Sequence, residues 1–151
     1  MTAEDKRAQR ALRLLALLAA LAAASCGGGG EAQPSLPDEP GSAVFVFRLR
    51  GHPSTEEFRV ATDSASFISQ ARAQLLLPPS QRLQFVIGAI EAGDGGHNIG
   101  WNWHFADASL TETAIELCDG TPRLLEADLD YWLNTVRSFC PWSSYVYAEV
   151  R

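Results

Sequence analysis

The sequence is poor in cysteine and lysine and has no long apolar run. Its 151 residues include three cysteines, one methionine and a single lysine, Lys6. The apolar run from Leu14 to Ala24 has eleven residues, whereas a transmembrane helix takes about 20. There is no HExxH zinc-protease motif, no GxSxG nucleophile motif and no CxxC pair. These absences argue against several common enzyme classes and against a membrane-spanning anchor helix.

The first 25 residues predict a bacterial export signal. Four basic residues lie within the first 13 positions, and the apolar run 14–24 that follows has the roughly 7–15 residues of a signal core. Ala23, Ala24 and Ser25 precede Cys26. This resembles a lipobox, whose cysteine is lipidated, although Ala23 stands where leucine is more common. We therefore expect residues 1–25 to be a lipoprotein signal peptide and Cys26 to carry the lipid. A cleaved signal followed by secretion is the alternative.

Residues 26–42 predict a flexible tether, because glycine, proline, serine and acids cannot bury enough apolar surface to become ordered. Residues 1–25 hold four of the 12 basic and two of the 18 acidic residues, which leaves 8 arginines against 16 acids and a net charge of −8. Such a chain repels phosphate backbones and anionic lipid. We expect no nucleic-acid partner, and contact with the membrane of the cell envelope only through the lipid anchor.

Residues 43–151 predict a single globular α+β domain. We expect a mostly antiparallel sheet of about five to six strands with two helices packed on it and one disulfide. The alternation of apolar residues is strongest in 43–50 and 82–93, and both faces of the second segment are apolar, which is typical of a central strand. The strands are expected over 43–50, 56–61, 82–93, 101–105, 111–118 and 143–150, and the helices over 64–77 and 122–137. The first helix is expected to be capped by Thr62 or Asp63.

Cys118 and Cys140 are left to pair if Cys26 carries lipid. In an oxidising compartment such a pair is expected to form a disulfide. The bridge closes a loop of about 22 residues and contributes roughly 3 kcal/mol in the chain-entropy model. Trp142 is expected to pack over it. Two metal-binding thiolates are the alternative.

The segment Gly95–Phe105, GGHNIGWNWHF, concentrates the candidate site residues. Its glycines favour a turn, and Asp94, His97 and Asn98 could offer ligands to calcium, although their spacing matches no EF-hand. In a strand, Trp101, Trp103 and Phe105 point to one side. They form either core or an aromatic platform for a sugar or peptide. The expected binding residues are His97, Asn98, Trp101, Trp103 and His104.

His104 is also the candidate general base of a hydrolase. Across a hairpin it can lie opposite Glu116, with Asp119 one turn beyond. A histidine paired with a carboxylate can act as a base, hold half of a metal site or form a buried structural hydrogen bond. In the metal-assisted version, calcium or zinc is bound by His97, His104, Glu116 and Asp119. The sequence offers no obvious nucleophile.

Four motifs in order resemble the BP seventy-four N-terminal domain family. They are NIGWNWHF, ELCDGTP, DLDYWL and FCPWSSYV, and the resemblance covers about 43–151. It implies a small, mostly exported domain with no settled catalytic role. The implied signature positions are Asn98, Gly100, Trp101, Trp103, His104, Glu116, Cys118, Asp119, Gly120, Pro122, Trp132, Cys140, Pro141 and Trp142.

Together these patterns predict an exported, lipid-anchored binding or interaction module of the cell envelope. Its partner would be a protein, a peptide or a small ligand. The alternatives are the hydrolase and a small protease inhibitor that uses the loop His52–Thr55. A hydrolase needs a concave pocket around His104, a binder needs exposed aromatic side chains, and an inhibitor needs a protruding rigid loop.

Overall fold

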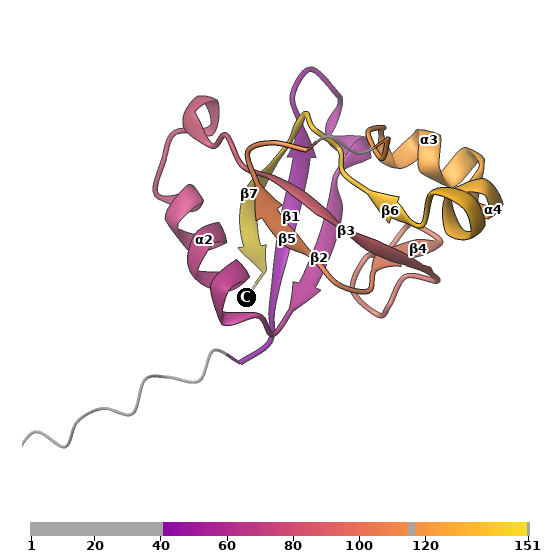
Figure 1. Ribbon diagram of the computed structural model, residues 1–151. Helices are drawn as coiled ribbons and strands as arrows, with labels where there is room; N and C mark the ends of the chain where they lie inside the picture. Colours follow the sequence, from indigo (N-terminus) through magenta and orange to yellow (C-terminus); the bar gives the residue numbers. More distant parts are fainter. Residues whose placement is uncertain (1–40, 115–116, 151) are drawn as a thin grey trace, which may run out of the picture. The chain divides into compact units, whose positions relative to one another are not determined.

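The computed structural model describes residues 41–114 and 117–150. Figure 1 shows strands from distant parts of the chain lying side by side, as β7 does beside β1. The elements follow in the order β1 (Ala43–Leu49), η1 (Ser54–Glu56), β2 (Phe58–Thr62), α2 (Ala65–Leu75), η2 (Pro79–Gln81), β3 (Phe85–Ala92), β4 (Trp103–Phe105), β5 (Ser109–Thr111), α3 (Pro122–Ala127), α4 (Leu129–Tyr131), η3 (Trp132–Val136), β6 (Ser138–Phe139) and β7 (Ser144–Val150).

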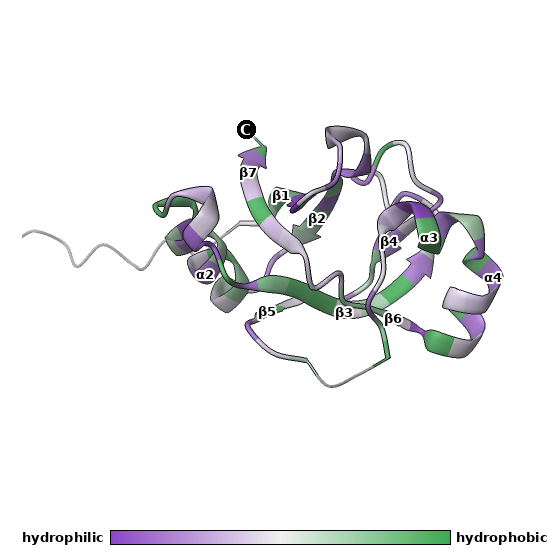
Figure 2. Cartoon of the chain, turned by 90° about the horizontal axis from the view of Figure 1, so that it is seen from above, coloured by the Kyte–Doolittle hydropathy of each residue, from purple (hydrophilic) through white to green (hydrophobic). Residues whose placement is uncertain are grey.

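The strands form two antiparallel sheets. One has three strands in the order β2-β1-β7, and in the other β3 pairs with β4, β5 and β6. Figure 2 shows β1, β2 and β7 on one side of the domain and β3, β5 and β6 on the other, with α2 at one end and α3 and α4 at the opposite end. The predicted α+β class with antiparallel pairing is confirmed. The strands are divided between two sheets, where the sequence analysis expected one.

The hydrophobic core lies between the two sheets. Phe45, Phe47 and Leu49 of β1 are buried and alternate with less buried residues, as the period of a half-exposed strand predicts. Across the core, the ring of Phe58 lies 5.7 Å from that of Trp103. Removing each of these large side chains from water stabilises the fold by about 1.5–3 kcal/mol, so the packing of the two sheets is the main source of stability.

Strand β3 is central, as its apolar faces predicted. Phe85–Ile87 pair with β5, Ile90–Ala92 pair with β4, and Gly88 pairs with Phe139 of β6. A Cβ atom at Gly88 would overlap the main-chain carbonyl of Asp107. Glycine is therefore required where the chain between β4 and β5 runs close beside β3.

Helix α2 confirms the first predicted helix, but its cap differs. The Ser64 hydroxyl accepts the amide hydrogen of Phe67, whereas Thr62 accepts from the amide of Ser64, one step before the helix. At the far end, the buried guanidinium of Arg82 donates to the carbonyl oxygens of Leu77 and Val146 at 2.9 Å each. This arginine joins the end of α2 to the edge of β7.

Two predicted elements are wrong in their extent. The expected helix 122–137 is broken, because Asp128 leaves helical geometry with φ −136° and ψ 54°, and the chain continues as α4 and a π-helical turn. Of the described residues in the expected strand 111–118, only Thr111 is in a strand, as the last residue of β5. Helical periodicity suggested the helix and alternation suggested the strand. Pairing with β3 decides where the strand stops.

The disulfide between Cys118 and Cys140 is confirmed. Both cysteines are buried, and they form a small second cluster with Phe85 of β3. The amide of Cys140 also donates to the carbonyl of Cys118 at 2.9 Å. Trp142, expected to pack over the bridge, is instead 47% exposed.

Candidate functional site

Asn98 fixes the loop that connects β3 to β4. Its side chain is fully buried. The amide oxygen accepts from the backbone N–H of Arg59 at 2.8 Å, and the amide nitrogen donates to the carbonyl of Trp103 at 2.8 Å. Asn98 was predicted as a binding residue, but both of its polar atoms already bond the loop to β2 and β4. Its role in this structure is to hold the loop.

The glycine-rich turn brings His97 and His104 together. Gly95 has φ +58°, and a Cβ atom there would lie 2.7 Å from the ring of His104 and 2.8 Å from that of His97. The two imidazole rings meet edge to face, with centroids 5.7 Å apart. Glycine is therefore needed at Gly95 for its left-handed conformation and for ring packing. We call Gly93–His104 the histidine loop.

Both histidines hydrogen-bond within the histidine loop. The Nδ1 atoms of His97 and His104 lie 2.9 Å from the carbonyl oxygens of Gly95 and Gly93, respectively. A carbonyl only accepts, so each Nδ1 carries the hydrogen and each Nε2 is left as an acceptor in the neutral ring. The Nε2 of His97 is buried and has no hydrogen-bond partner among the described residues. The Nε2 of His104 lies 3.8 Å from Glu91.

His104 was expected to lie opposite Glu116 across a hairpin, and its observed cross-strand neighbour is Glu91. Strand β4 pairs with β3, which places His104 opposite Glu91. Glu116 lies outside the described residues. Asp119 accepts the amide hydrogen of Trp142 at 2.9 Å, which holds the chain after the disulfide. The two described members of the candidate catalytic set, His104 and Asp119, therefore have separate partners, Glu91 and Trp142.

The tryptophans of the same segment belong mainly to the interior. Trp103 is completely buried, and Phe105 is nearly so. Trp101 is partly buried, and its indole N–H donates to the carbonyl of Glu57 at 2.9 Å. Of the two interpretations of this stripe, core packing is confirmed for Trp103. Burial makes Trp103 unavailable to a surface ligand, so its predicted binding role is not supported.

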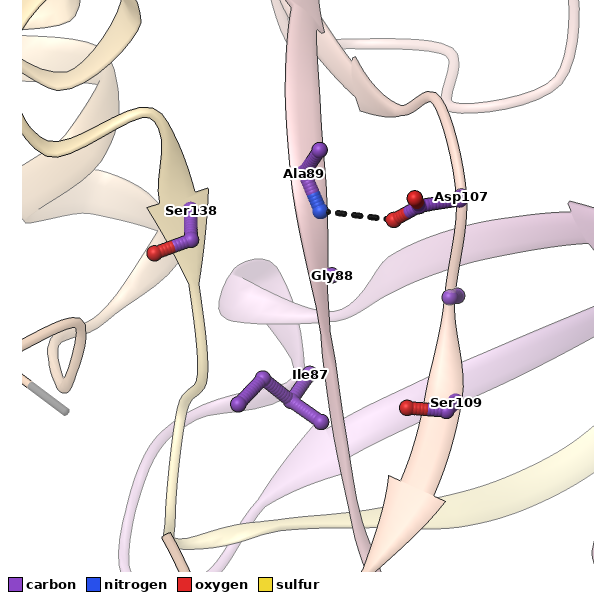
Figure 3. A pocket seen from close by; sticks show the side chains of 7 residues that line it. Ile87, Gly88, Ala89, Asp107, Ser109 and Ser138 are labelled. Carbon is purple, nitrogen blue, oxygen red and sulfur yellow. Dashed lines mark hydrogen bonds between the residues drawn. The ribbon is translucent and has the colours of Figure 1, made fainter. Parts of the chain in front are cut away.

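The described pockets lie away from the histidine loop. Figure 3 shows the largest of them, a shallow depression of about 430 Å³ beside β3, lined by small side chains such as Ala89, Ser109 and Ser138. Its one carboxylate, Asp107, accepts from the amide of Ala89 at 2.8 Å. Within residues 41–114 and 117–150, no three histidine, cysteine, aspartate or glutamate side chains are grouped to hold a metal ion. Nor is any helix there long and apolar enough to cross a bilayer.

Four exposed apolar side chains lie in or near the segment 117–120. Leu117 and Tyr131 line one shallow depression. Leu124 approaches Gly120, and the amide of Trp142 is bonded to Asp119. The exposed fractions are 98% for Leu117, 54% for Leu124, 50% for Tyr131 and 47% for Trp142. We call these four residues the disulfide patch. Sequence reasoning missed it because Leu117 falls in a predicted strand, Leu124 and Tyr131 fall in a predicted helix, and Trp142 was expected to pack over the disulfide.

These features define an α+β domain of two sheets with one disulfide. Both histidines and Asn98 of its histidine loop form hydrogen bonds with the backbone of the same loop. The profile of the BP seventy-four N-terminal domain matches residues 41–151. The chain belongs to the BP seventy-four N-terminal domain family, as its four motifs indicated. No significant match was found among curated proteins or among solved structures.

Proposed function

We propose that this protein is an exported binding module, anchored by lipid at Cys26, that holds a partner protein in the cell envelope. The disulfide patch carries the proposal. Large apolar side chains gathered on a surface are typical of protein interaction sites, and Leu117 is almost fully exposed. The tether 26–42 would give the domain reach from the membrane.

Export is supported by two independent features. The basic and apolar segments before Cys26 have the pattern of a signal peptide. The disulfide between Cys118 and Cys140 is of the kind that persists in oxidising compartments and is rare in the cytosol. Both features favour a folded domain outside the cytoplasm.

The hydrolase alternative has weaker support. A general base has to reach the proton that it removes, and it is usually oriented by a hydrogen-bonded carboxylate. The Nδ1 of His104 instead contacts the carbonyl of Gly93, and the Nε2 lies 3.8 Å from the carboxylate of Glu91. The loop suggested for a protease inhibitor is exposed from His52 to Thr55, but no contact in the structure favours that function.

Site-specific photocrosslinking in living cells tests the binding proposal. A photoreactive amino acid placed at Leu117 is expected to give a discrete crosslinked protein band. Leu76 is the matched control, because it is 88% exposed at the end of α2 and outside the disulfide patch. Equal labelling from both positions, or none from Leu117, would contradict a partner at this patch.

Metabolic labelling tests the anchor separately. Cells that express the full chain are fed an alkyne fatty acid, and the protein is then tagged and fractionated. We expect label and membrane association in the parent chain and neither in Cys26→Ala. If the parent protein is unlabelled and released, the lipid anchor is refuted while the crosslinking result still decides the binding proposal.

A further inference from the structure

The three-stranded sheet has an outer face on which arginines and tyrosines are stacked. Phe47 and Leu49 of β1 point to the core, so Arg48 and Arg50 point outward. The guanidinium of Arg48 lies 3.5 Å from the ring centre of Tyr147, and that of Arg50 lies 4.8 Å from that of Tyr145. We call this surface, together with Arg59 of β2, the Arg–Tyr face.

A bulge in β7 exposes the second tyrosine. Val46 pairs with Ala148 while the next residue, Phe47, pairs with Val146, so Tyr147 is an extra residue opposite β1. Tyr147 is 40% exposed. The Arg–Tyr face is therefore open to a ligand.

The Arg–Tyr face reverses the charge of the rest of the domain. It holds three of the 8 arginines that remain after the signal, against 16 acids overall. Its one ion pair among the described residues joins Arg48 to Glu57 at 3.1 Å. Burial lowers the pKa of Arg48, but the hydrogen bond to Glu57 and the charges of Tyr147 and Glu57 raise it overall. The guanidinium of Arg59 has no hydrogen bond or ion pair in the described residues.

Arg50 extends this face into a pocket of about 340 Å³. Arg50, His52, Ser80 and Tyr145 are among its lining residues. Arg50 donates to the carbonyls of Ser143, Ser144, Pro79 and Arg82, and no carboxylate among the described residues forms an ion pair with it. The pocket thus combines a fixed positive charge, a hydroxyl group and an aromatic ring, which suits a carboxylate.

We propose that the Arg–Tyr face binds an extended acidic peptide of a partner protein, with carboxylates at alternate positions. Arg48 lies in β1 and Arg50 directly follows its last residue, so their backbone positions are about 6.6 Å apart. Same-side residues of an extended peptide have the same repeat, and the contact of Arg48 with Glu57 shows that the face accepts a carboxylate. The proposal rests on the binding function, but it concerns a surface other than the disulfide patch.

The chain's own tether is the competing occupant. Residues 26–42 contain Glu31, Asp38 and Glu39 and no basic residue. Only Asp38 and Glu39 come close in sequence to β1, and they are adjacent rather than alternate. Their spacing fits the arginine repeat less well than an alternating peptide does, so the proposal commits to a separate chain.

The test compares two synthetic peptides of equal charge by calorimetry with the mature chain, residues 26–151. One alternates glutamate and threonine, and the other contains the same residues as Glu-Glu-Thr-Thr blocks. We expect the alternating peptide to bind about fivefold more tightly, and Arg59→Gln and the double variant Arg48→Gln/Arg50→Gln each to weaken it about tenfold. Arg123→Gln, whose side chain is 67% exposed elsewhere, is the control and should bind as the parent does. Circular dichroism checks that each variant is folded.

Three results would overturn the proposal. One is that neither peptide binds, and another is that binding is unchanged in Arg59→Gln. The third is binding that emerges only in Glu31→Gln/Asp38→Asn/Glu39→Gln, which would assign the face to the tether. A crosslink from Leu117 would survive all three, so failure here is distinguishable from failure of the proposed binding function.

Discussion

The histidine loop and the Arg–Tyr face differ in which residue types they contain and in how accessible those side chains are to a ligand. The histidine loop has the residues that usually suggest chemistry, but Asn98 and Trp103 are buried and both histidines are bonded within it. The Arg–Tyr face comes from three ordinary-looking strands, yet its cations are at least partly exposed and have few acidic partners. The comparison teaches that a site depends on which side chains folding leaves accessible, and not on residue type alone.

Replacing Asn98 gives the largest expected effect and tests whether the histidine loop is scaffold. Asn98→Ala leaves the amide of Arg59 and the carbonyl of Trp103 without their partners. Each unsatisfied buried group costs about 1–3 kcal/mol, so we expect a loss of about 4 kcal/mol in the free energy of unfolding, measured by urea denaturation. Asn102→Ala is the control, because that amide contacts Glu126 on the surface. Equal losses in both variants would refute the scaffold role.

Removing the disulfide should cost somewhat less. Cys118→Ala/Cys140→Ala opens a loop with a sequence separation of 22, for which the chain-entropy model gives about 3 kcal/mol. Reducing agent should lower the stability of the parent protein similarly and leave the double variant unaffected. Sensitivity of the double variant to the reductant would show that the bridge is not the cause.

His104→Ala separates structure from catalysis. It removes one hydrogen bond to Gly93 and the contact with His97, and we expect a loss of about 1 kcal/mol. A screen of ester, peptide and glycoside substrates should give the same background rate for parent and variant. A parent-specific activity that disappears in His104→Ala, with the fold intact, would restore the hydrolase hypothesis.

Arg59→Gln should have the smallest effect on stability. Its guanidinium has no polar contact among the described residues, and surface substitutions of this kind usually change stability by less than about 0.5 kcal/mol. Thermal denaturation should therefore superimpose on that of the parent, although we expect peptide binding to weaken. A marked loss of stability would mean that Arg59 supports the sheet and is not held ready for a ligand.

Sequence reasoning was most successful where a signal is local. Alternation within β1 and β7, the buried character of β3 and the cysteine pair all follow from neighbouring residues. The predicted strand 111–118 overlaps the observed strand only at Thr111, because pairing with β3 forms β5 over Ser109–Thr111. The helix 122–137 failed at Asp128, whose non-helical geometry periodicity does not reveal.

The sites were harder to predict than the fold. The sequence identified the histidine loop, but it could not show that Asn98 is bonded to β2, 39 residues earlier. The Arg–Tyr face needs Arg48 and Tyr147 to meet across paired strands and needs the bulge at Tyr147. Both are consequences of long-range register, which one sequence without its pairing does not specify.

The central claim is that the protein binds its partner through the disulfide patch and not through the histidine loop. Photocrosslinking from Leu117, compared with photocrosslinking from Ile99, tests it most directly. Both side chains are well exposed, at 98% and 64%, and Ile99 lies in the histidine loop. The account predicts a partner crosslink from Leu117 and none from Ile99. A crosslink from Ile99 alone would contradict it, because the loop interpreted as scaffold would then be the binding surface.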